Sequence, residues 1–280
     1  MNHQNHWYGH AHVLARYAGV TGRPPRIWGY LQHGWNVHDG YGADDSPPEG
    51  APRLVWSDAP RRRGWLAGAH NYRVIGAPFA YLLAMTPEPA KPRKRRGTIY
   101  YPFHGWEAQA VFGDHRRLAA EIAEREEPPV TICLYWVEHR YPQIREVYES
   151  FGFRVITHGR RGGYQNADPR FLDRQLAELR RHRRVASNRL GTALLYGAAA
   201  GCEVGVYGDE MLIENEHPAY GGNARIRRLW PQLHTPVVPP AVSAAFAAEE
   251  LGQRHVAGPA ELADLLGWSD VLDNRHRLAG

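Results

Sequence analysis

The stretch Val185–Gly208 (VASNRLGTALLYGAAAGCEVGVYG) constrains the fold most, because it predicts two strands separated by a short helix. Val185 and Ala186 end one strand, Leu190–Ala200 is a helix rich in Ala and Gly, and Glu203–Tyr207 is the next strand. A helix with so many small residues packs closely on a sheet, as nucleotide-binding βα units require. Its N-terminus offers backbone N–H groups and the positive end of the helix dipole, which favour phosphate. The alternative is an ordinary βαβ crossover without a ligand.

The rest of the second half repeats the same alternation of strand and helix. Five strands are expected at Thr98–Pro102, Val130–Tyr135, Arg154–Thr157, Arg184–Ala186 and Glu203–Tyr207. The helices expected between them are Glu107–Glu126, Tyr141–Phe151, Pro169–His182 and Leu190–Ala200. Short apolar strands that alternate with amphipathic helices predict a parallel, doubly wound sheet.

The first half predicts a smaller α/β lobe. Its expected strands are Ile27–Gln32, Leu54–Ser57 and Tyr72–Ile75, and its expected helices lie near 6–18, 61–69 and 79–85. A Pro-rich, basic linker, Thr86–Gly97, separates the lobes. We therefore expect an N-terminal lobe over residues 1–90, a second lobe over 97–245 and a helical tail over 246–280. The tail is expected to pack back through Leu262, Leu265, Leu266 and Trp268.

Composition limits the class of protein. The chain has 280 residues, of which 43% are hydrophobic and 22% charged, as in soluble globular proteins. No apolar run reaches the roughly 18 residues that a membrane span needs. Two lone thiols, Cys133 and Cys202, suit a reducing cytosol, so a cytoplasmic location is expected. The net charge of +5 fits an anionic small molecule or peripheral contact with an anionic membrane. Nucleic acid is the weaker interpretation because no recognition motif accompanies the basic runs.

Polar and ionisable residues follow the expected strands. In an open parallel sheet, ligands bind beyond the carboxyl ends of the strands, so these residues are the natural candidates. They comprise His33, His104, Glu107, Glu138, His139, His158, Arg160, Arg161, Ser187, Asn188, Asp209 and Glu210. Hydroxyls, a helix N-terminus and arginines suit phosphate, acids suit sugar hydroxyls, and aromatic rings suit a base. Together they favour a nucleotide-linked donor.

The sequence combines two expected α/β lobes, a Pro-rich linker, a terminal helix, and the loop Ser187-Asn188-x-x-Gly191-Thr192 before a small-residue helix. In these features it resembles GT-B glycosyltransferases. The sequence Gln32-His33-Gly34 is similar to a loop of capsule and cell-surface polysaccharide transferases, and the tail pattern Glu250-Leu251-Gly252 to Gly267-Trp268 adds to the likeness. The resemblance implies two Rossmann-like lobes with a cleft between them and transfer of a sugar from a nucleotide sugar to a glycan or small-molecule acceptor.

The resemblance also implies roles for single residues. Ser187, Asn188, Gly191 and Thr192 would hold the donor phosphate, which Arg160 or Arg161 would neutralise, and Asp209 or Glu210 would lie near sugar or ribose hydroxyls. His104, Glu107 and His158 would complete the donor site. His33, whose type titrates near neutral pH, would be the general base on the acceptor, with Asp39, Asp44 or Asp45 as substitutes. Because no Asp-x-Asp motif is present, we expect metal-independent transfer without a cofactor other than the nucleotide sugar.

Other interpretations stay open at this point. A CMP-sugar (sialyl- or Kdo-type) transferase would use a His-Pro pair, and His217-Pro218 lies later in the chain than that pair is expected. A nucleotide-sugar epimerase and a non-catalytic nucleotide- or glycan-binding protein are the further alternatives. The N-terminal histidines His3, His6, His10 and His12 suit either a metal site or, as the default, a solvent-exposed terminal segment.

Overall fold

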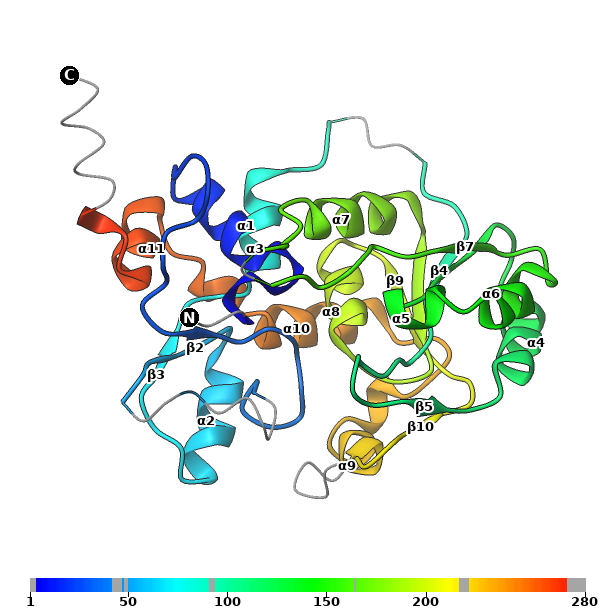
Figure 1. Cartoon of the computed structure of the whole chain (residues 1–280). Helices are drawn as coiled ribbons and strands as arrows, with labels where there is room; N and C mark the ends of the chain where they lie inside the picture. Colours follow the sequence, from blue (N-terminus) through cyan, green and yellow to red (C-terminus); the bar gives the residue numbers. More distant parts are fainter. Residues whose placement is uncertain are drawn as a thin grey trace. The chain divides into compact units, whose positions relative to one another are not determined.

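The structure of the chain is a computed structural model that describes residues 4–41, 47, 50–90, 94–163, 165–216 and 222–270. The chain forms two compact units. The first combines the described parts of Met1–Pro89, Arg161–Asp173 and Ala248–Gly280, and the second those of Ala90–Arg160 and Arg174–Ala247. Each contains a parallel β-sheet with helices, so the predicted α/β class is confirmed (Figure 1).

The first unit has a small parallel sheet with the strand order β1-β2-β3. The strands are β1 (Tyr30–Leu31), β2 (Arg53–Val55) and β3 (Tyr72–Val74). Helix α2 (Asp58–Leu66) follows β2 and begins after Ser57, whose hydroxyl accepts a hydrogen bond from the backbone N–H of Ala59 at 3.2 Å. Helix α3 (Pro78–Met85) follows β3 and begins at a proline, the residue that suits a first helical turn.

The N-terminal segment is broken rather than one helix. A 3₁₀ helix, η1 (Gln4–Gly9), precedes α1 (His10–Tyr17), and Tyr8 and Gly9 at the junction have left-handed φ values of 55° and 73°. A Cβ on Gly9 would lie 2.5 Å from the carbonyl oxygen of Asp168, so this position requires glycine. The expectation of an exposed segment is wrong for His6 and His10, which are 5% and 1% exposed. His3 lies outside the described residues.

The tail returns to the first unit, as expected. Helix α10 (Pro240–Glu250), the 3₁₀ turn η4 (Gln253–His255) and α11 (Pro259–Leu266) follow one another. Leu262, Leu266 and Trp268 are fully buried, Leu265 is half-buried, and the Trp268 indole donates to the carbonyl of Arg26 at 3.1 Å. Gly252 adopts φ 63°, and its Cβ would overlap the carbonyl of Trp56, so the tail can pass there only as glycine.

The second unit contains the predicted five-stranded parallel sheet, with the order β7-β6-β4-β8-β9. The strands are β4 (Thr98–Tyr101), β6 (Val130–Cys133), β7 (Arg154–Ile156), β8 (Arg184–Ser187) and β9 (Glu203–Val206). Every strand overlaps its expected range. Cys133 and Cys202 are buried free thiols.

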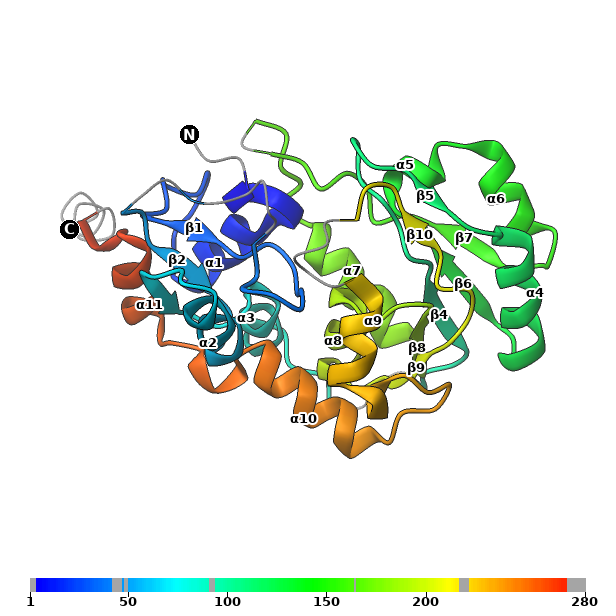
Figure 2. The same ribbon diagram turned by 90° about the horizontal axis from the view of Figure 1, so that it is seen from below.

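Helices cover both faces of this sheet (Figure 2). On one face lie α4 (His115–Arg125) and α6 (Pro142–Glu149), and their Leu118, Ile122 and Tyr148 pack on Tyr100 and Ile132 of the strands. On the other lie α7 (Phe171–Arg181) and α8 (Thr192–Ala199). A Cβ on Gly197 of α8 would come within 2.3 Å of the Val185 side chain, which explains the small residues of this helix. Four-residue helix α5 (Trp136–His139) follows β6.

The predicted helix Glu107–Glu126 is wrong over its first half. Trp106 pairs with Gln109, and β5 (Val111–Phe112) then pairs antiparallel with β10 (Leu212–Ile213). Helix α4 begins only after Asp114, whose carboxylate accepts from the backbone N–H of Arg117 at 2.9 Å. Two further elements, α9 (Gly222–Leu229) and η3 (Pro231–Leu233), precede α10.

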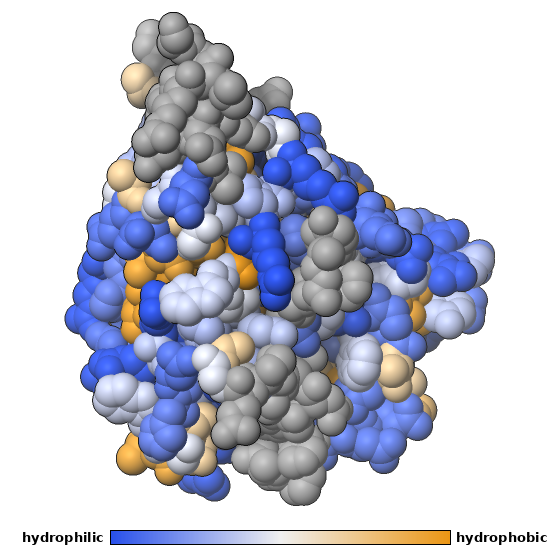
Figure 3. Space-filling model, turned by 60° about the vertical axis from the view of Figure 1, so that its left-hand side comes forward, coloured by the Kyte–Doolittle hydropathy of each residue, from blue (hydrophilic) through white to orange (hydrophobic). Residues whose placement is uncertain are grey.

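The surface drawn in Figure 3 is mainly polar, with small apolar areas among the polar side chains. Within the described part of the chain, no helix has both the length and the apolar character that crossing a membrane requires.

Candidate functional site

The sheet of the second unit has a topological switch point between β4 and β8. From β4 the chain first adds β6 and β7 on one side, then returns to place β8 and β9 on the other. Adjacent loops therefore leave β4 and β8 in opposite directions, and this is where open α/β sheets bind ligands. The loops after β4 and β8 carry the residues that the sequence singles out: His104 and Glu107 after one strand, and Ser187 and Asn188 at the end of the other.

Asn188 joins three of these loops. Its side-chain oxygen accepts from the backbone N–H of Phe103 at 2.6 Å, and its amide nitrogen donates to the carbonyl of Asp209 at 2.5 Å. Asn188 is only 3% exposed, so both polar ends are engaged within the protein. We therefore assign it to holding the loops after β4, β8 and β9 together rather than to direct contact with a phosphate.

The N-terminus of α8 is open. Its N-cap residue is Gly191, in an extended conformation, and it makes no side-chain capping hydrogen bond. A Cβ on Gly191 would meet no described atom within 4 Å apart from its chain neighbours, so the described residues leave room at this N-cap position. Thr192 is half-buried in that turn. Ser187 is 6% exposed, and its hydroxyl accepts from the backbone N–H of Arg189 at 3.3 Å.

The loop after β9 is tied to the same region by Arg189. Its guanidinium donates to the carbonyls of Glu210 and Met211, pairs with Glu216 at 3.2 Å and lies 3.8 Å from the centre of the Phe103 ring. Burial lowers the pKa of Arg189, and Glu216 opposes that shift. The Asp209 carboxylate accepts from the backbone N–H of Met211 at 2.9 Å, whereas the Glu210 carboxylate pairs with Arg227.

The loops after β4, β6 and β7 contribute aromatic and basic side chains at the carboxyl ends of the strands. The exposed His104 ring stacks on Tyr135 with centroids 4.3 Å apart. Glu107 accepts from the Trp136 indole at 3.2 Å, and the Arg160 guanidinium lies 4.3 Å from the centre of the Trp136 ring. The loops after β4, β6 and β7 are thus connected through Trp136.

His158 points inward. It is 6% exposed, and its Nε2 lies 2.9 Å from the hydroxyl of Tyr101. Burial lowers its pKa to about 4, and the backbone carbonyl of His158 accepts from Arg174 at 2.7 Å. The imidazole is therefore neutral at physiological pH. His158 packs inside the second unit, against Tyr101, rather than on the surface of the candidate site.

In the first unit, His33 follows β1 after Gln32. The preceding Gln32 fixes this turn, because its side-chain oxygen accepts from the backbone N–H of Trp56 at 2.9 Å and its amide donates to the carbonyl of Gly34 at 3.0 Å. The Trp7 ring meets His33 edge-on at 4.7 Å. Burial and, secondly, the charge of Arg161 lower the pKa of His33 to about 4. The expected titration near neutral pH is therefore wrong.

Arg161 belongs to this unit, unlike Arg160. Its guanidinium lies 4.1 Å from the centre of the Trp7 ring, and its backbone carbonyl accepts from Tyr8 N–H at 2.7 Å. The two neighbouring arginines therefore serve different units.

Asp39 is engaged rather than free. It is 4% exposed and accepts from the Tyr72 hydroxyl at 2.7 Å, from the backbone N–H of Tyr41 at 3.1 Å and from His38 at 3.0 Å. Burial alone raises its pKa, but these hydrogen bonds outweigh burial and leave it lowered. A carboxylate so occupied organises the loop after His33 and is a poor candidate for a base. Asp44, Asp45 and the His217-Pro218 pair lie outside the described residues.

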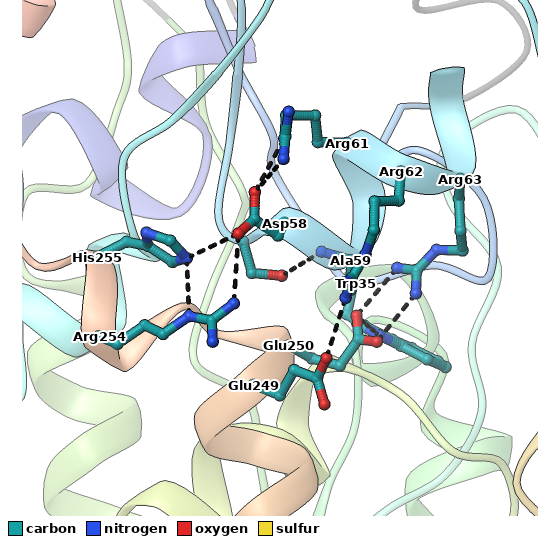
Figure 4. Close-up of polar contacts among 11 residues, drawn as sticks. Trp35, Asp58, Ala59, Arg61, Arg62, Arg63, Glu249, Glu250, Arg254 and His255 are labelled. Atoms are coloured by element: carbon teal, nitrogen blue, oxygen red, sulfur yellow. Dashed lines mark hydrogen bonds and ion pairs between the residues drawn. The ribbon is translucent and has the colours of Figure 1, made fainter. Parts of the chain in front are cut away.

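A cluster of ion pairs fixes the tail within the first unit (Figure 4). The two terminal nitrogens of the Arg63 guanidinium donate to the Glu250 carboxylate at 2.9 Å, and the Trp35 indole donates to the same carboxylate at 2.8 Å. The Glu250 side chain is only 5% exposed. The neighbouring Arg62–Glu249 pair is exposed by more than half on both sides. The buried pair thus joins α2, the loop after β1 and the end of α10.

Three polar groups have surroundings that the sequence does not predict. Arg189 follows Ser187 and Asn188, and its contacts with the loop after β9 become visible only in the structure. Glu138 is among the strand-end candidates; one of its carboxylate oxygens accepts from Gly105 N–H at 3.2 Å, and the other is buried with no partner among the described residues. His10 is among the N-terminal histidines, and neither of its ring nitrogens has a described partner.

Within the described ranges, no cluster of three or more His, Cys, Asp or Glu side chains has the arrangement of a metal site.

Comparison with family models and with curated protein sequences finds no match. Among solved structures, the chain is similar to a mutant of TarM from S. aureus, in complex with fondaparinux, alpha-GlcNAc-glycerol and UDP. The TM-score is 0.35 at 10% identity, over 76% of this chain and 42% of the TarM chain, so the chain spans well under half of that protein's length.

Proposed function

We propose that the chain is a GT-B-type glycosyltransferase that moves a sugar from a nucleotide donor to a glycan or small-molecule acceptor. One observation carries the proposal: the open N-terminus of α8 lies beside the switch point of a doubly wound sheet. Helix N-termini bind phosphate through their backbone N–H groups and dipole, and the switch point is where nucleotides bind in such sheets. The Ser-Asn-x-x-Gly-Thr resemblance agrees with this placement.

The donor would bind to the second unit. Its phosphates would lie against Gly191 and Thr192, while Asn188 and Arg189 hold the surrounding loops. Asp209 supplies a carboxylate at the end of β9 for sugar or ribose hydroxyls. Arg160 and the rings of His104 and Trp136 offer charge and flat surfaces for the rest of the donor.

In the transfer step, an acceptor hydroxyl oxygen would attack the anomeric carbon of the donor sugar. The bond from that carbon to the phosphate oxygen breaks, and the nucleotide leaves with the electron pair. The positive end of α8 stabilises the charge that develops on the leaving phosphate. His33 would take the proton of the acceptor hydroxyl at Nδ1, which has no partner among the described residues. We propose that no metal takes part, which predicts activity unchanged by EDTA.

A thermal-shift panel of CMP, CDP, UDP, GDP and dTDP tests the proposal, because a ligand that binds only the folded state raises the unfolding temperature. We expect nucleotides of one base to raise the unfolding temperature of the protein. We also expect the protein to hydrolyse the nucleotide sugar of that base slowly when no acceptor is present. Interconversion of two free nucleotide sugars would instead identify an epimerase. Tight binding without turnover would identify a binding protein, and no stabilisation by any nucleotide would refute the proposal.

A further inference from the structure

The first unit holds an unusual pair of histidines, of which His10 is buried and His33 is half-buried. His10 is 1% exposed, and its two ring nitrogens have no partner among the described residues; the same is true of His33 Nδ1. A buried polar group without a partner costs about 1–3 kcal/mol, so native proteins rarely keep one without a use. His10 and His33 lie near enough to influence each other's charge.

Both rings lie by the carboxyl ends of the small parallel sheet. His33 follows β1 after Gln32, and the His10 ring lies 6.3 Å from that of Trp56, which follows β2. Burial lowers the pKa of His10 to about 3, so both imidazoles are neutral at physiological pH. Each then offers one N–H donor and one acceptor nitrogen.

The backbone before His10 is held in a demanding conformation. Tyr8, a residue with a Cβ, has φ 55°, and Gly9 packs against the carbonyl of Asp168. The Tyr8 ring lies 5.0 Å from that of Phe171. Such strain persists where the surrounding structure enforces it, often at ligand sites. Here it places His10 at the start of α1, facing the ends of β1 and β2.

The chemistry of the pair selects the ligand. A hydroxyl both donates and accepts, so a polyol satisfies neutral imidazoles in either tautomer, whereas a carboxylate can only accept and an ammonium group only donate. The charge of Arg161 is engaged over Trp7, and no third ligand completes a metal cluster among the described residues. Trp7, edge-on to His33, adds an aromatic ring of the kind that borders sugar sites.

We infer that His10 and His33 form a subsite for an uncharged, hydroxyl-rich ligand, and that this ligand is the sugar of the acceptor. The inference deepens the proposed function and rests on it for the identity of the acceptor. His10 binds one hydroxyl, while His33 accepts a hydrogen bond from the reacting hydroxyl.

Saturation-transfer NMR with the full chain tests this subsite. The probes are the methyl glycosides of glucose, galactose and N-acetylglucosamine, with inorganic phosphate as a competitor. We expect at least one glycoside to bind the wild type, and His10→Phe to weaken it at least tenfold while unfolding at the same or a higher temperature. His12→Phe, a half-buried histidine of the same helix, is the matched control and should bind as the wild type does.

Equal binding by His10→Phe, no glycoside binding by the wild type, or displacement by phosphate would each overturn the inference. If His10→Phe fails to fold, the imidazole ¹⁵N shifts of His10 in the wild type decide: they should move when the glycoside is added, and constant shifts would refute contact. UDP titration of the same samples separates the two proposals. Glycoside binding that needs His10, in a protein that binds no nucleotide, would refute the proposed transferase and leave the sugar subsite standing.

Discussion

The side-chain oxygen of Asn188 accepts a hydrogen bond from the backbone N–H of Phe103 at 2.6 Å, at the switch point between β8 and β4. The bond ties the two loops that diverge there, and the amide of the same residue extends the link to Asp209 after β9. The three loops near the N-terminus of α8 are thereby connected to one another through Asn188.

Asn188→Leu should therefore affect stability as well as binding. The substitution leaves the N–H of Phe103 and the carbonyl of Asp209 without their partner, which costs about 1–3 kcal/mol for each buried group left unpaired. Urea unfolding measures the loss, and Asn166→Ala, at an exposed position, is the control. Normal stability combined with lost nucleotide affinity would instead make Asn188 a direct phosphate ligand.

The Arg63–Glu250 pair predicts a contrast between neighbours. Arg63→Met leaves the buried Glu250 carboxylate with only the Trp35 indole, and breaking a buried pair in this way costs about 3–5 kcal/mol. Arg62→Met breaks an exposed pair and should cost about 0–1 kcal/mol. Equal unfolding free energies for the two variants would show that the buried pair does not hold the tail.

His33→Ala should lower turnover by about 10²–10⁴-fold with donor affinity nearly constant, as for loss of a general base. Because burial lowers the pKa of His33 to about 4, the imidazole is already neutral at neutral pH. The wild-type rate should therefore show no loss from protonation of His33 until the pH approaches 4. Turnover near the wild-type level would show that His33 does not take part in the proton transfer, and lost donor affinity would make it a donor ligand. His70 is exposed, and His70→Ala is the control variant.

Stability should fall as the pH falls. The folded-state pKa values of His10, His33 and His158 are lowered to about 3, 4 and 4, from 6.5 in the unfolded chain. Between about pH 6.5 and 4 the unfolded chain binds protons that the folded chain does not, so each histidine costs roughly 1.4 kcal/mol per pH unit there. Urea unfolding near pH 7 and pH 5 measures the slope, which His10→Phe should reduce. Equal stability at both values would contradict these shifts.

Local patterns predicted the second sheet well. The apolar strands expected at 98–102, 130–135, 154–157, 184–186 and 203–207 are patterns of consecutive residues, and each overlaps a strand of the structure. The helix expected from Pro169 begins later, at Phe171. Asp168 Oδ1 accepts from the backbone N–H of Arg170 at 2.9 Å near that helix start.

The errors involve pairing between distant segments. Residues 107–112 look helical by their alanines, but β5 pairs with β10 about a hundred residues later, and Gly113 packs on Met211. The backbone just before His10 likewise depends on distant residues, because Gly9 lies against Asp168 and Tyr8 against Phe171, which join the first unit from the middle of the chain. The lowered pKa of His33 follows from the same packing, so the residue type alone predicted the wrong titration.

The central claim, that a donor phosphate binds at the N-terminus of α8, is tested most directly by calorimetry of the Gly191→Val variant. The ligand is the nucleoside diphosphate that stabilises the wild type in the thermal-shift panel. Gly191 is an extended N-cap with nothing described within 4 Å of its Cβ, so valine should fold normally but fill the space in front of α8. Gly258, the N-cap of α11, is equally open, and Gly258→Val is the matched control. The account predicts that Gly191→Val loses nucleotide binding by at least tenfold at unchanged unfolding temperature, while Gly258→Val binds as the wild type does. Wild-type affinity in Gly191→Val would contradict a donor phosphate at the N-terminus of α8.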